Sequence, residues 1–277
     1  MNNRLVKEYV RAICELKPKA FVMENVAMLR SQVHRFFLEE QDLDNERIMQ
    51  LSLSEDKIEI LPKSVNFENS ISFLETAQKE FGFAWAESFY KIINILYRYR
   101  INPVKFDATL EKYQKKLIAQ LNEIVRLTTE VQELNVLQQN DERMAKAILQ
   151  YIEKKDNFDA VILAIGDSII MQRAIMKIKE LTDNDIHIFE YKEENGSLVA
   201  VVKSYPVLDY IRAILENEPY NYTLSENTLN AIHYGVPQRR ERFIIVGLKK
   251  ELNTKYTAPE IKFTEGNYRT VHDAIAD

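Results

Sequence analysis

The chain has 277 residues, enough for about two domains, and its 46% hydrophobic content supports a folded core rather than a disordered chain. Its 37 Lys and Arg residues against 42 Asp and Glu residues give a net charge of −5, which excludes a generally basic, nucleic-acid-coating surface. Its single cysteine excludes an internal disulfide and a multi-cysteine zinc site.

The sequence lacks the patterns of exported and membrane proteins. The N-terminal residues do not have the pattern of a signal peptide. The longest apolar run in the rest of the chain, residues 160–165, is too short to span a bilayer. We therefore expect a cytoplasmic protein with no membrane partner. The six glycines stand far apart in the sequence, so we expect no glycine-rich phosphate loop and no self-sufficient nucleotide-cofactor site.

The first predicted elements are a helix and a strand. The spacing of six residues predicts a helix with one apolar face: Leu5, Val6, Tyr9, Val10, Ile13 and Cys14. Pro18 ends this helix, and residues 20–23 read as a fully buried strand of the parallel-sheet type, followed by Glu24 and Asn25. This is one unit of a doubly wound sheet, in which ligands bind beyond the carboxyl ends of the strands, so Glu24 lies where chemistry is expected.

The middle of the chain, from about residue 33 to 203, has a largely helical pattern. Two seams recur at heptad spacing: Leu110, Leu117, Ile124 and Val131, with Tyr113, Leu127 and Leu134 beside them. These heptads, within residues 104–155, fit either a coiled-coil hairpin or dimer arm, or a long helix lying on its own domain.

A small αβ element is predicted after the heptads. Residues 160–165 read as a strand that ends in a turn at Asp167, followed by a helix over 169–181 and a second strand over 186–191. Asp167 is either a metal or sugar ligand or, the interpretation we favour, a turn-capping residue.

The last part of the chain returns to the first pattern. An amphipathic helix is predicted from Val207, Leu208, Ile211 and Leu215. A strand is predicted at residues 221–224 and a buried strand at 243–247. Residues 229–238, which lead toward the second of these strands, have the composition of an irregular segment with several turns. Because side chains alternate along an extended segment, Arg240 and Arg242 are expected to share one face.

Two of these segments resemble DNA (cytosine-5)-methyltransferases. Residues 21–26 resemble the family's ENV motif on its strand, and residues 229–242 resemble its Q-x-R-x-R motif with the approach that precedes it. Leu5 stands where the family's R-x-x-L element has its leucine, although Asn2 replaces the arginine. Residues 268–275 resemble the segment that leads into the family's target recognition domain.

The resemblance implies an α/β fold: a partial doubly wound, Rossmann-like sheet of the S-adenosylmethionine-dependent methyltransferase type, with a large, mainly helical insertion. The expected boundaries place a partial catalytic domain at residues 1–35 and 204–277 and the insertion at 36–203. Within the insertion we expect the heptad helix at about 104–155 and the αβ element at about 158–203.

The resemblance also implies roles for individual residues. Methylation of cytosine C5 requires a thiolate that adds at C6 and a base extruded from the duplex. Glu24 would be the carboxyl group that hydrogen-bonds cytosine N3 and the exocyclic amine, and Arg240 and Arg242 would hold O2 and its neighbours. The remaining implied residues are Asn25 and Gln238 for substrate and Leu5 for the cofactor S-adenosyl-L-methionine. Each assignment has a structural alternative. Glu24 could form a salt bridge or cap a helix at the end of its strand, and the arginines could be a solvent-exposed charge cluster beside a strand.

Several parts of the family pattern are missing from this sequence. No Pro-Cys dipeptide precedes Glu24, and Cys14, on the apolar face of the first helix, is expected to be a core residue rather than a nucleophile. The glycine-rich cofactor loop is also missing, so the cofactor site is incomplete and the chain alone is expected to be inactive.

Three hypotheses explain a partial pattern of this kind. In the first, the chain is part of a restriction-modification DNA methyltransferase, with DNA and a complementing methyltransferase subunit as partners and residues 104–155 as a candidate self-association segment. In the second, it is a non-catalytic remnant or regulatory protein that associates through its helical arm. In the third, it is a truncated gene product, for which we expect exposed apolar strand edges.

Overall fold

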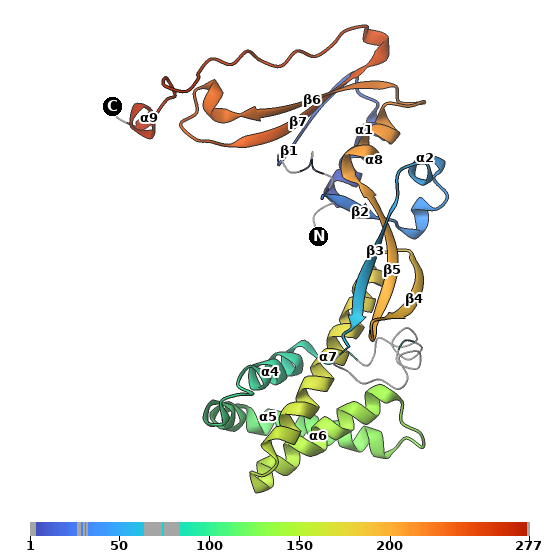
Figure 1. Cartoon of the computed structure of the whole chain (residues 1–277), viewed down its shortest axis with the longest axis vertical. Helices are drawn as coiled ribbons and strands as arrows, with labels where there is room; N and C mark the ends of the chain where they lie inside the picture. Colours follow the sequence, from blue (N-terminus) through green and yellow to red (C-terminus); the bar gives the residue numbers. More distant parts are fainter. Residues whose placement is uncertain are drawn as a thin grey trace. The chain divides into compact units, whose positions relative to one another are not determined.

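A computed structural model of the chain describes residues 4–26, 29, 31, 33–63, 74 and 84–275. The described chain is mixed α/β, which confirms the predicted fold class (Figure 1). It divides into two compact units, one formed by Met1–Asp56 with Val202–Asp277 and the other by Lys57–Val201. We describe each unit separately.

The first unit contains short helices and a three-stranded sheet. Its helices are α1 (Arg4–Leu16), α2 (Glu46–Met49), α8 (Val207–Leu215) and α9 (Val271–Ile275), with short 3₁₀ turns at Glu40–Asp42, Ala231–Tyr234 and Lys250–Leu252. Its three-stranded sheet comprises β1 (Ala20–Val26), β6 (Tyr222–Asn230) and β7 (Glu241–Lys249). The predicted helix at 207–215 and the predicted strand at 243–247 are thereby confirmed.

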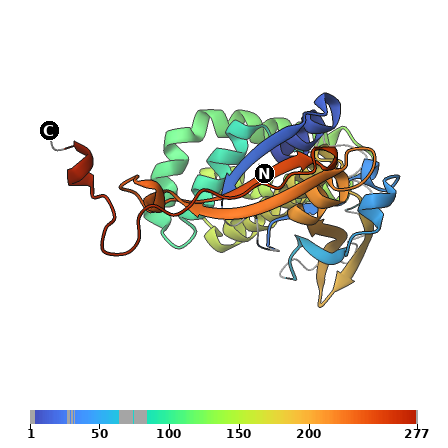
Figure 2. The same cartoon turned by 90° about the horizontal axis from the view of Figure 1, so that it is seen from above.

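The three strands follow the order β1-β7-β6, and β7 is antiparallel to both neighbours (Figure 2). The outer strands β1 and β6 therefore run in the same direction. The strand predicted at residues 20–23 is present but differs from the prediction: it continues to Val26 and includes Glu24, and it is half-buried with alternating side chains rather than fully buried. The reason is that one of its faces is covered by described residues and the other is open.

The covered face of the sheet carries the core of the first unit. Met23 of β1 and Ile245 of β7 are direct partners and both are buried. Phe21 lies opposite Gly247, where a Cβ atom would come within 2.1 Å of the Phe21 ring, so glycine lets the ring lie against the strand. Tyr222 completes this contact edge-to-face, with its ring centroid 5.1 Å from that of Phe21.

Helix α1 packs on this core through a narrower face than the sequence pattern predicts. Val6, Val10 and Ile13 are buried, and Cys14 packs against them, which confirms it as a core residue. Leu5, in contrast, is 70% exposed and does not belong to the core. The three buried residues, at positions i, i+4 and i+7, are enough to cover the face of α1 that contacts the core, so the side chains on either side of this face point outward.

A second sheet has the strand order β2-β5-β3, and β4 also pairs with β5. Its strands are β2 (Arg35–Phe37), β3 (Ser54–Leu61), β4 (Ile188–Glu194) and β5 (Ser197–Pro206). The predicted second strand at 186–191 is present as β4, whereas β5 lies in a stretch that we expected to be helical. Asn195 and Gly196 both have positive φ, the geometry of the Asn-Gly turns that join two antiparallel strands, and this dipeptide was the missed signal.

Among its described residues, the second unit contains four long helices: α4 (Glu87–Arg98), α5 (Pro103–Thr129), α6 (Val136–Lys154) and α7 (Phe158–Asp183). Consecutive helices contact each other and α4 also contacts α7, so the four surround a common hydrophobic core (Figure 1). Leu110 and Leu117 are fully buried in this core, whereas Leu127 and Val131 are exposed. The heptad residues from Leu110 to Leu127 therefore belong to a long helix that packs within its own domain, paired with α6 as a hairpin, whereas Val131 and Leu134 lie between the two helices.

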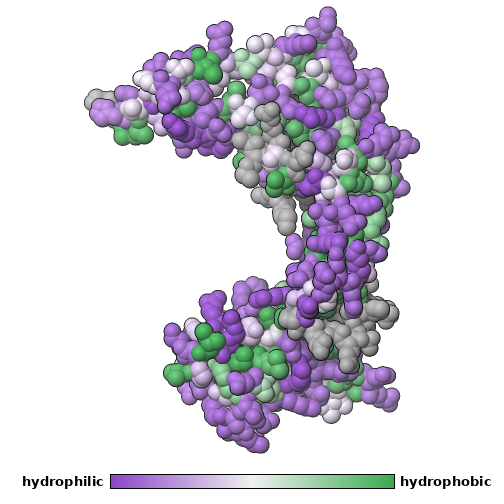
Figure 3. Space-filling model, in the orientation of Figure 1, coloured by the Kyte–Doolittle hydropathy of each residue, from purple (hydrophilic) through white to green (hydrophobic). Residues whose placement is uncertain are grey.

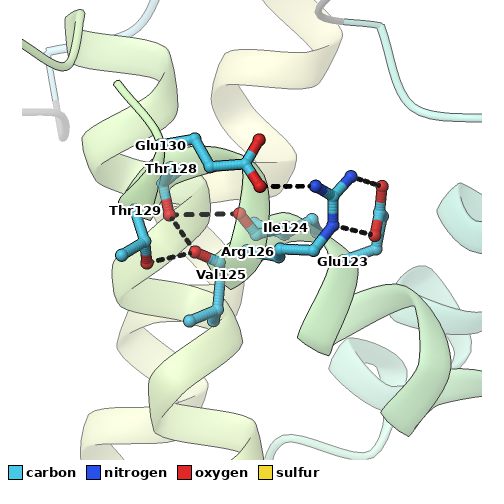
Figure 4. A network of polar contacts seen from close by, with 7 residues as sticks. All are labelled: Glu123, Ile124, Val125, Arg126, Thr128, Thr129 and Glu130. Carbon is cyan, nitrogen blue, oxygen red and sulfur yellow. Dashed lines mark hydrogen bonds and ion pairs between the residues drawn. The ribbon is translucent and has the colours of Figure 1, made fainter. Parts of the chain in front are cut away.

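The predicted continuous helical stretch is interrupted between α5 and α6. At the end of α5 the Thr129 hydroxyl donates a hydrogen bond to the Val125 carbonyl, and Arg126 forms ion pairs with Glu123 (2.7 Å) and Glu130 (2.6 Å) (Figure 4). Asn135 then begins α6, because its side chain accepts a hydrogen bond from the first helical turn. The side-chain cap of Asn135 thus restarts the helical structure after α5 has ended without glycine or proline.

The strand predicted at 160–165 was wrong, because these residues lie inside α7. Val161, Ala164 and Ile165 are buried at helical spacing, so the apolar run is a helix buried on several sides. Gly166 admits the Tyr97 side chain, whose hydroxyl lies 3.1 Å from the place a Cβ would occupy. Asp167 forms an ion pair with Arg143 at 2.5 Å, so it does not cap a turn.

Two further findings concern membranes and metals. Of the helices that the structure describes, none combines the length and apolarity needed to cross a bilayer. Within the same residues, no group of three or more His, Cys, Asp or Glu side chains is arranged to hold a metal ion. Hydrophilic side chains predominate on the face of the molecule seen in Figure 3.

Candidate functional site

The structure brings Glu24 and Arg242 together across the β1–β7 pair. Glu24 is the direct partner of Ile244, and Arg242 that of Val26, so these four side chains lie on one face of the sheet. Arg242 Nε lies 2.5 Å from Glu24 Oε1, which makes the two an ion pair although they are far apart in the sequence. Two neighbouring strands in fixed register therefore create the contact.

This ion pair lies on the open face of the sheet. The Glu24 side chain is 53% exposed and that of Arg242 is 29% exposed, so both remain accessible to a ligand. Val22 and Val26, which flank Glu24 along β1, are 59% and 48% exposed. The carboxylate accepts hydrogen bonds and the guanidinium donates them in a plane, so the pair can bind a flat polar group beside an apolar surface.

Arg240 takes a different position from Arg242. It precedes β7 and is exposed, and the structure records no ion pair between it and Glu24 among the described residues. Its backbone N–H donates to Asn230 Oδ1 (3.1 Å) and its carbonyl accepts from Ala231 N–H (3.0 Å). The extended segment that would align the two arginines thus begins only at Glu241.

Asn230 is a residue to which our sequence analysis assigned no role. Its side-chain oxygen accepts hydrogen bonds from the backbone N–H groups of Ile232 and Arg240, at 3.3 and 3.1 Å. It therefore holds together both ends of the loop that carries Gln238. The signal that could have identified it is an Asn directly before a turn-rich segment, the position that favours side-chain capping.

The C-terminal segment lies along this loop. The His233 Nδ1 atom is 3.0 Å from the Phe263 carbonyl oxygen, and the Tyr234 hydroxyl donates to the Pro259 carbonyl at 3.1 Å. Gly235 has φ of +90°, a value that glycine adopts without strain. Gln238 is exposed in the loop and its backbone N–H donates to the Val236 carbonyl.

The remaining predicted site residues do not join Glu24. Asn25 points to the opposite face of β1, where it pairs with Phe243, and its Oδ1 accepts a hydrogen bond from Val26 N–H at 2.8 Å. Leu5 lies exposed on α1. Burial raises the pKa of the Cys14 thiol, although a hydrogen bond with Tyr220 partly opposes the effect. A thiol of this kind is a poor nucleophile.

Comparison with known proteins shows what the chain resembles. Residues 1–45 and 194–277 match the family model of C-5 cytosine-specific DNA methylases, which supports the resemblance that the motifs predicted. Three type II methyltransferases are similar to it: M.BbvI of Brevibacillus brevis (34% identical over 31% of this chain), M.BspRI of Lysinibacillus sphaericus (45% over 20%) and M.DdeI of Desulfomicrobium norvegicum (38% over 24%).

The similarity covers a limited part of each protein. The aligned segments amount to 22% of M.BbvI, 14% of M.BspRI and 17% of M.DdeI. The chain thus spans between about a seventh and a fifth of the length of these relatives. No solved structure matches the chain.

Proposed function

We propose that the chain is part of a restriction-modification DNA (cytosine-5)-methyltransferase and supplies the groups that hold the target cytosine. The observation that carries this proposal is the contact between Glu24 and Arg242, which lie in the two segments that resemble the family's motifs. Both side chains are accessible on one face of the sheet. DNA would be the substrate and S-adenosyl-L-methionine the methyl donor.

In the proposed reaction Glu24 receives the cytosine edge. The base leaves the duplex, and Glu24 hydrogen-bonds N3 and the exocyclic amine while Arg242 donates to O2. A cysteine thiolate then bonds to C6, which makes C5 nucleophilic. After C5 gains the methyl group, its proton passes to a base and the thiolate leaves. Arg240 and Gln238, both exposed before β7, complete the substrate contacts in this proposal. Asn25, proposed from the motif as a substrate residue, acts through the end of β1, where its Oδ1 accepts from Val26 N–H.

The residues of this chain do not fit a complete cofactor site. S-adenosyl-L-methionine would supply an electrophilic methyl group, but Leu5, the residue expected near it, is exposed on α1. The isolated glycines form no phosphate or dinucleotide loop. We therefore assign the cofactor site and the Pro-Cys nucleophile to a complementing polypeptide, without which this chain is inactive.

The test is methyl transfer from labelled S-adenosyl-L-methionine to DNA, measured with the chain co-expressed with a polypeptide that has the cofactor loop and Pro-Cys. Glu24→Gln should lower the rate by about a hundredfold or more, because N3 of neutral cytosine is an acceptor and the amide cannot supply the proton that N3 receives when the thiolate adds at C6. Arg242→Ala should also lower it, by about tenfold or more.

The matched control is Glu226→Gln, which removes another ion-paired carboxylate of the same sheet, 2.7 Å from Arg212. This variant should keep the parental rate, and Glu24→Gln should still form the complex. If Glu24→Gln and Arg242→Ala are as active as the parent, the assignment of the site is wrong.

The alternative function is non-catalytic association through the helical unit, including self-association through residues 104–155. The exposed side chains of Leu127 and Val131 favour a contact there. Failure to associate with any complementing methyltransferase polypeptide, together with concentration-dependent dimerisation that Leu127→Glu abolishes, would favour this alternative.

A further inference from the structure

We propose that helix α5 and the corner that joins it to α4 form a DNA-binding surface, which contacts the phosphates of the duplex. We call it the α5 basic surface, and it consists of Arg98, Arg100, Lys105, Lys112 and Lys116. This surface belongs to the second unit, whereas the ion pair of the candidate site belongs to the first. The choice of DNA among polyanions rests on the proposed function, but the pattern of charge does not depend on it.

Positive charge is concentrated in one short segment of an otherwise acidic chain. Residues 98–116 contain six basic and two acidic residues, whereas the whole chain has a net charge of −5. One of the two acids, Asp107, forms an ion pair with Lys155 at 2.8 Å. A local excess of positive charge on an acidic protein attracts a polyanion to that part of its surface.

The three lysines of the surface form a row along one side of α5. Lys105, Lys112 and Lys116 stand at i, i+7 and i+11, which are close to whole numbers of helical turns. All three are exposed, while Phe106 and Leu110 are buried on another side of the helix. At the helical rise per residue the row is about 16 Å long. Phosphates of one DNA strand follow each other every 3.4 Å or about that along the duplex axis, so the row can reach several of them.

Within the residues that the structure describes, none of the five cations of the α5 basic surface forms an ion pair with an acidic side chain. Other cations of the same four helices are paired in this way: Lys91, Arg126, Arg143, Lys146, Lys155 and Lys179. A cation without a carboxylate partner can bind a phosphate and lose only its mobile counterions. The α5 basic surface is therefore better suited to DNA than the paired cations are.

The α4–α5 corner holds one guanidinium group in place (Figure 1). Arg100 Cζ lies 5.0 Å from the centroid of the Tyr97 ring, and its Nη1 donates to the Tyr97 carbonyl at 3.4 Å. The exposed guanidinium thus has a preferred position, which reduces the entropy lost when it binds a phosphate. Ile101 and Val104 of the same corner are 88% and 79% exposed. Apolar side chains next to cations are typical of proteins that enter the minor groove of DNA.

The pattern favours DNA over a membrane surface. A helix that lies on a membrane presents an apolar face along its length. The apolar face of α5 is buried in the core of its own unit through Leu110, Leu117 and Leu121. Between Lys105 and Lys116, a stretch that the structure describes completely, no large hydrophobic side chain is exposed. A row of lysines on a polar helix face fits a phosphate backbone instead.

The experiment measures binding of the full chain to a short DNA duplex of arbitrary sequence, by fluorescence anisotropy at several salt concentrations. Lys112→Gln combined with Lys116→Gln should weaken binding by about tenfold at low salt. The slope of log affinity against log salt should fall by about two, because two phosphate contacts are lost. Glutamine preserves the helix propensity of α5, and unchanged circular dichroism verifies that the variant is folded.

The matched control is Lys91→Gln combined with Lys146→Gln, which removes the same charge from α4 and α6. Both lysines already have carboxylate partners, so the affinity should change by less than about twofold. Absence of duplex binding by the parent, or equal losses in the control and the α5 variant, overturns the proposal. So does tighter binding of the parent to phosphatidylserine vesicles or to single-stranded RNA than to the duplex, because another polyanion would then be the partner.

Methyl transfer by the co-expressed complex separates this inference from the proposed function. DNA binding that depends on Lys112 and Lys116, with a rate of methyl transfer that Glu24→Gln leaves unchanged, supports the α5 basic surface and contradicts the cytosine site. Methyl transfer that Glu24→Gln lowers, with the same DNA affinity in the α5 variant as in the parent, supports the proposed function and contradicts the α5 basic surface.

Discussion

At the scale of single residues, the contact between Glu24 and Arg242 is the most informative feature of this chain. Either residue alone is a charged side chain near a strand end, with an ordinary structural explanation. Their ion pair at 2.5 Å shows that the two motif-like segments meet on one open face. The ion pair also has a consequence for binding: a base that bonds to Glu24 must compete with or share the Arg242 guanidinium.

Asp141 gives a prediction at the same scale. Burial raises the pKa of its carboxyl group to about 7, and the hydrogen bond from Trp85 Nε1 (2.9 Å) opposes part of this rise. The unfolded chain has the ordinary pKa of about 3.9, so the folded state holds more protons between these values. The stability from neutral Asp141 is therefore complete below about pH 4 and is lost as the pH rises through about 7.

Asp141→Asn should flatten this dependence, because the amide stays neutral. Urea unfolding of parent and variant between pH 5 and pH 8 measures it, and the variant should gain stability relative to the parent as the pH rises. Asp183→Asn, which loses only a surface ion pair with Lys179, is the control. Parallel curves for parent and Asp141→Asn would contradict the assignment.

At the scale of elements, the ends of helices and strands differ most from what periodicity predicts. The stretch from 104 to 155 contains two helices, because α5 ends at Thr129 and the Asn135 side chain caps the start of α6. The run at 160–165 is helical because α7 is buried on several sides, a case in which a short apolar run has the same pattern as a buried strand.

The capping residue Asn135 gives a prediction for this scale. Its side chain accepts a hydrogen bond from Gln138 N–H at 2.9 Å, while the Gln138 side chain accepts one from Asn135 N–H at 3.1 Å. Asn135→Ala should lower the free energy of unfolding by about 1 kcal/mol, because the first turn of α6 loses this partner. Asn135→Ser should restore most of the loss, and denaturation followed by Trp85 fluorescence measures both. Equal stability of the Ala variant and the parent would show that the cap does not contribute.

At the scale of the whole molecule, the chain contains two compact units, each with a hydrophobic core. The first unit contains both segments that resemble the methyltransferase motifs, and the second is formed by the chain between them. Two separate cores are expected to unfold as separate cooperative units unless a large apolar interface joins them.

The single tryptophan makes this expectation measurable, since Trp85 lies in the second unit. Trp85 fluorescence should follow the unfolding of the second unit alone, while far-ultraviolet circular dichroism follows both units. We therefore expect the two urea transitions to have different midpoints. Coincident transitions would indicate that the chain unfolds as one cooperative body.

The sequence by itself determined the resemblance to cytosine-5 methyltransferases, the α/β class and the residues that the motifs select. Motifs and amphipathic spacing are local properties, so Val207–Leu215 and the strand around Ile245 could be predicted from their own residues. Only the tertiary structure decided that Arg242 reaches Glu24 while Arg240 and Asn25 do not. Such contacts depend on strand register, which shifts a side chain to the other face with each residue and is set by partners distant in the sequence.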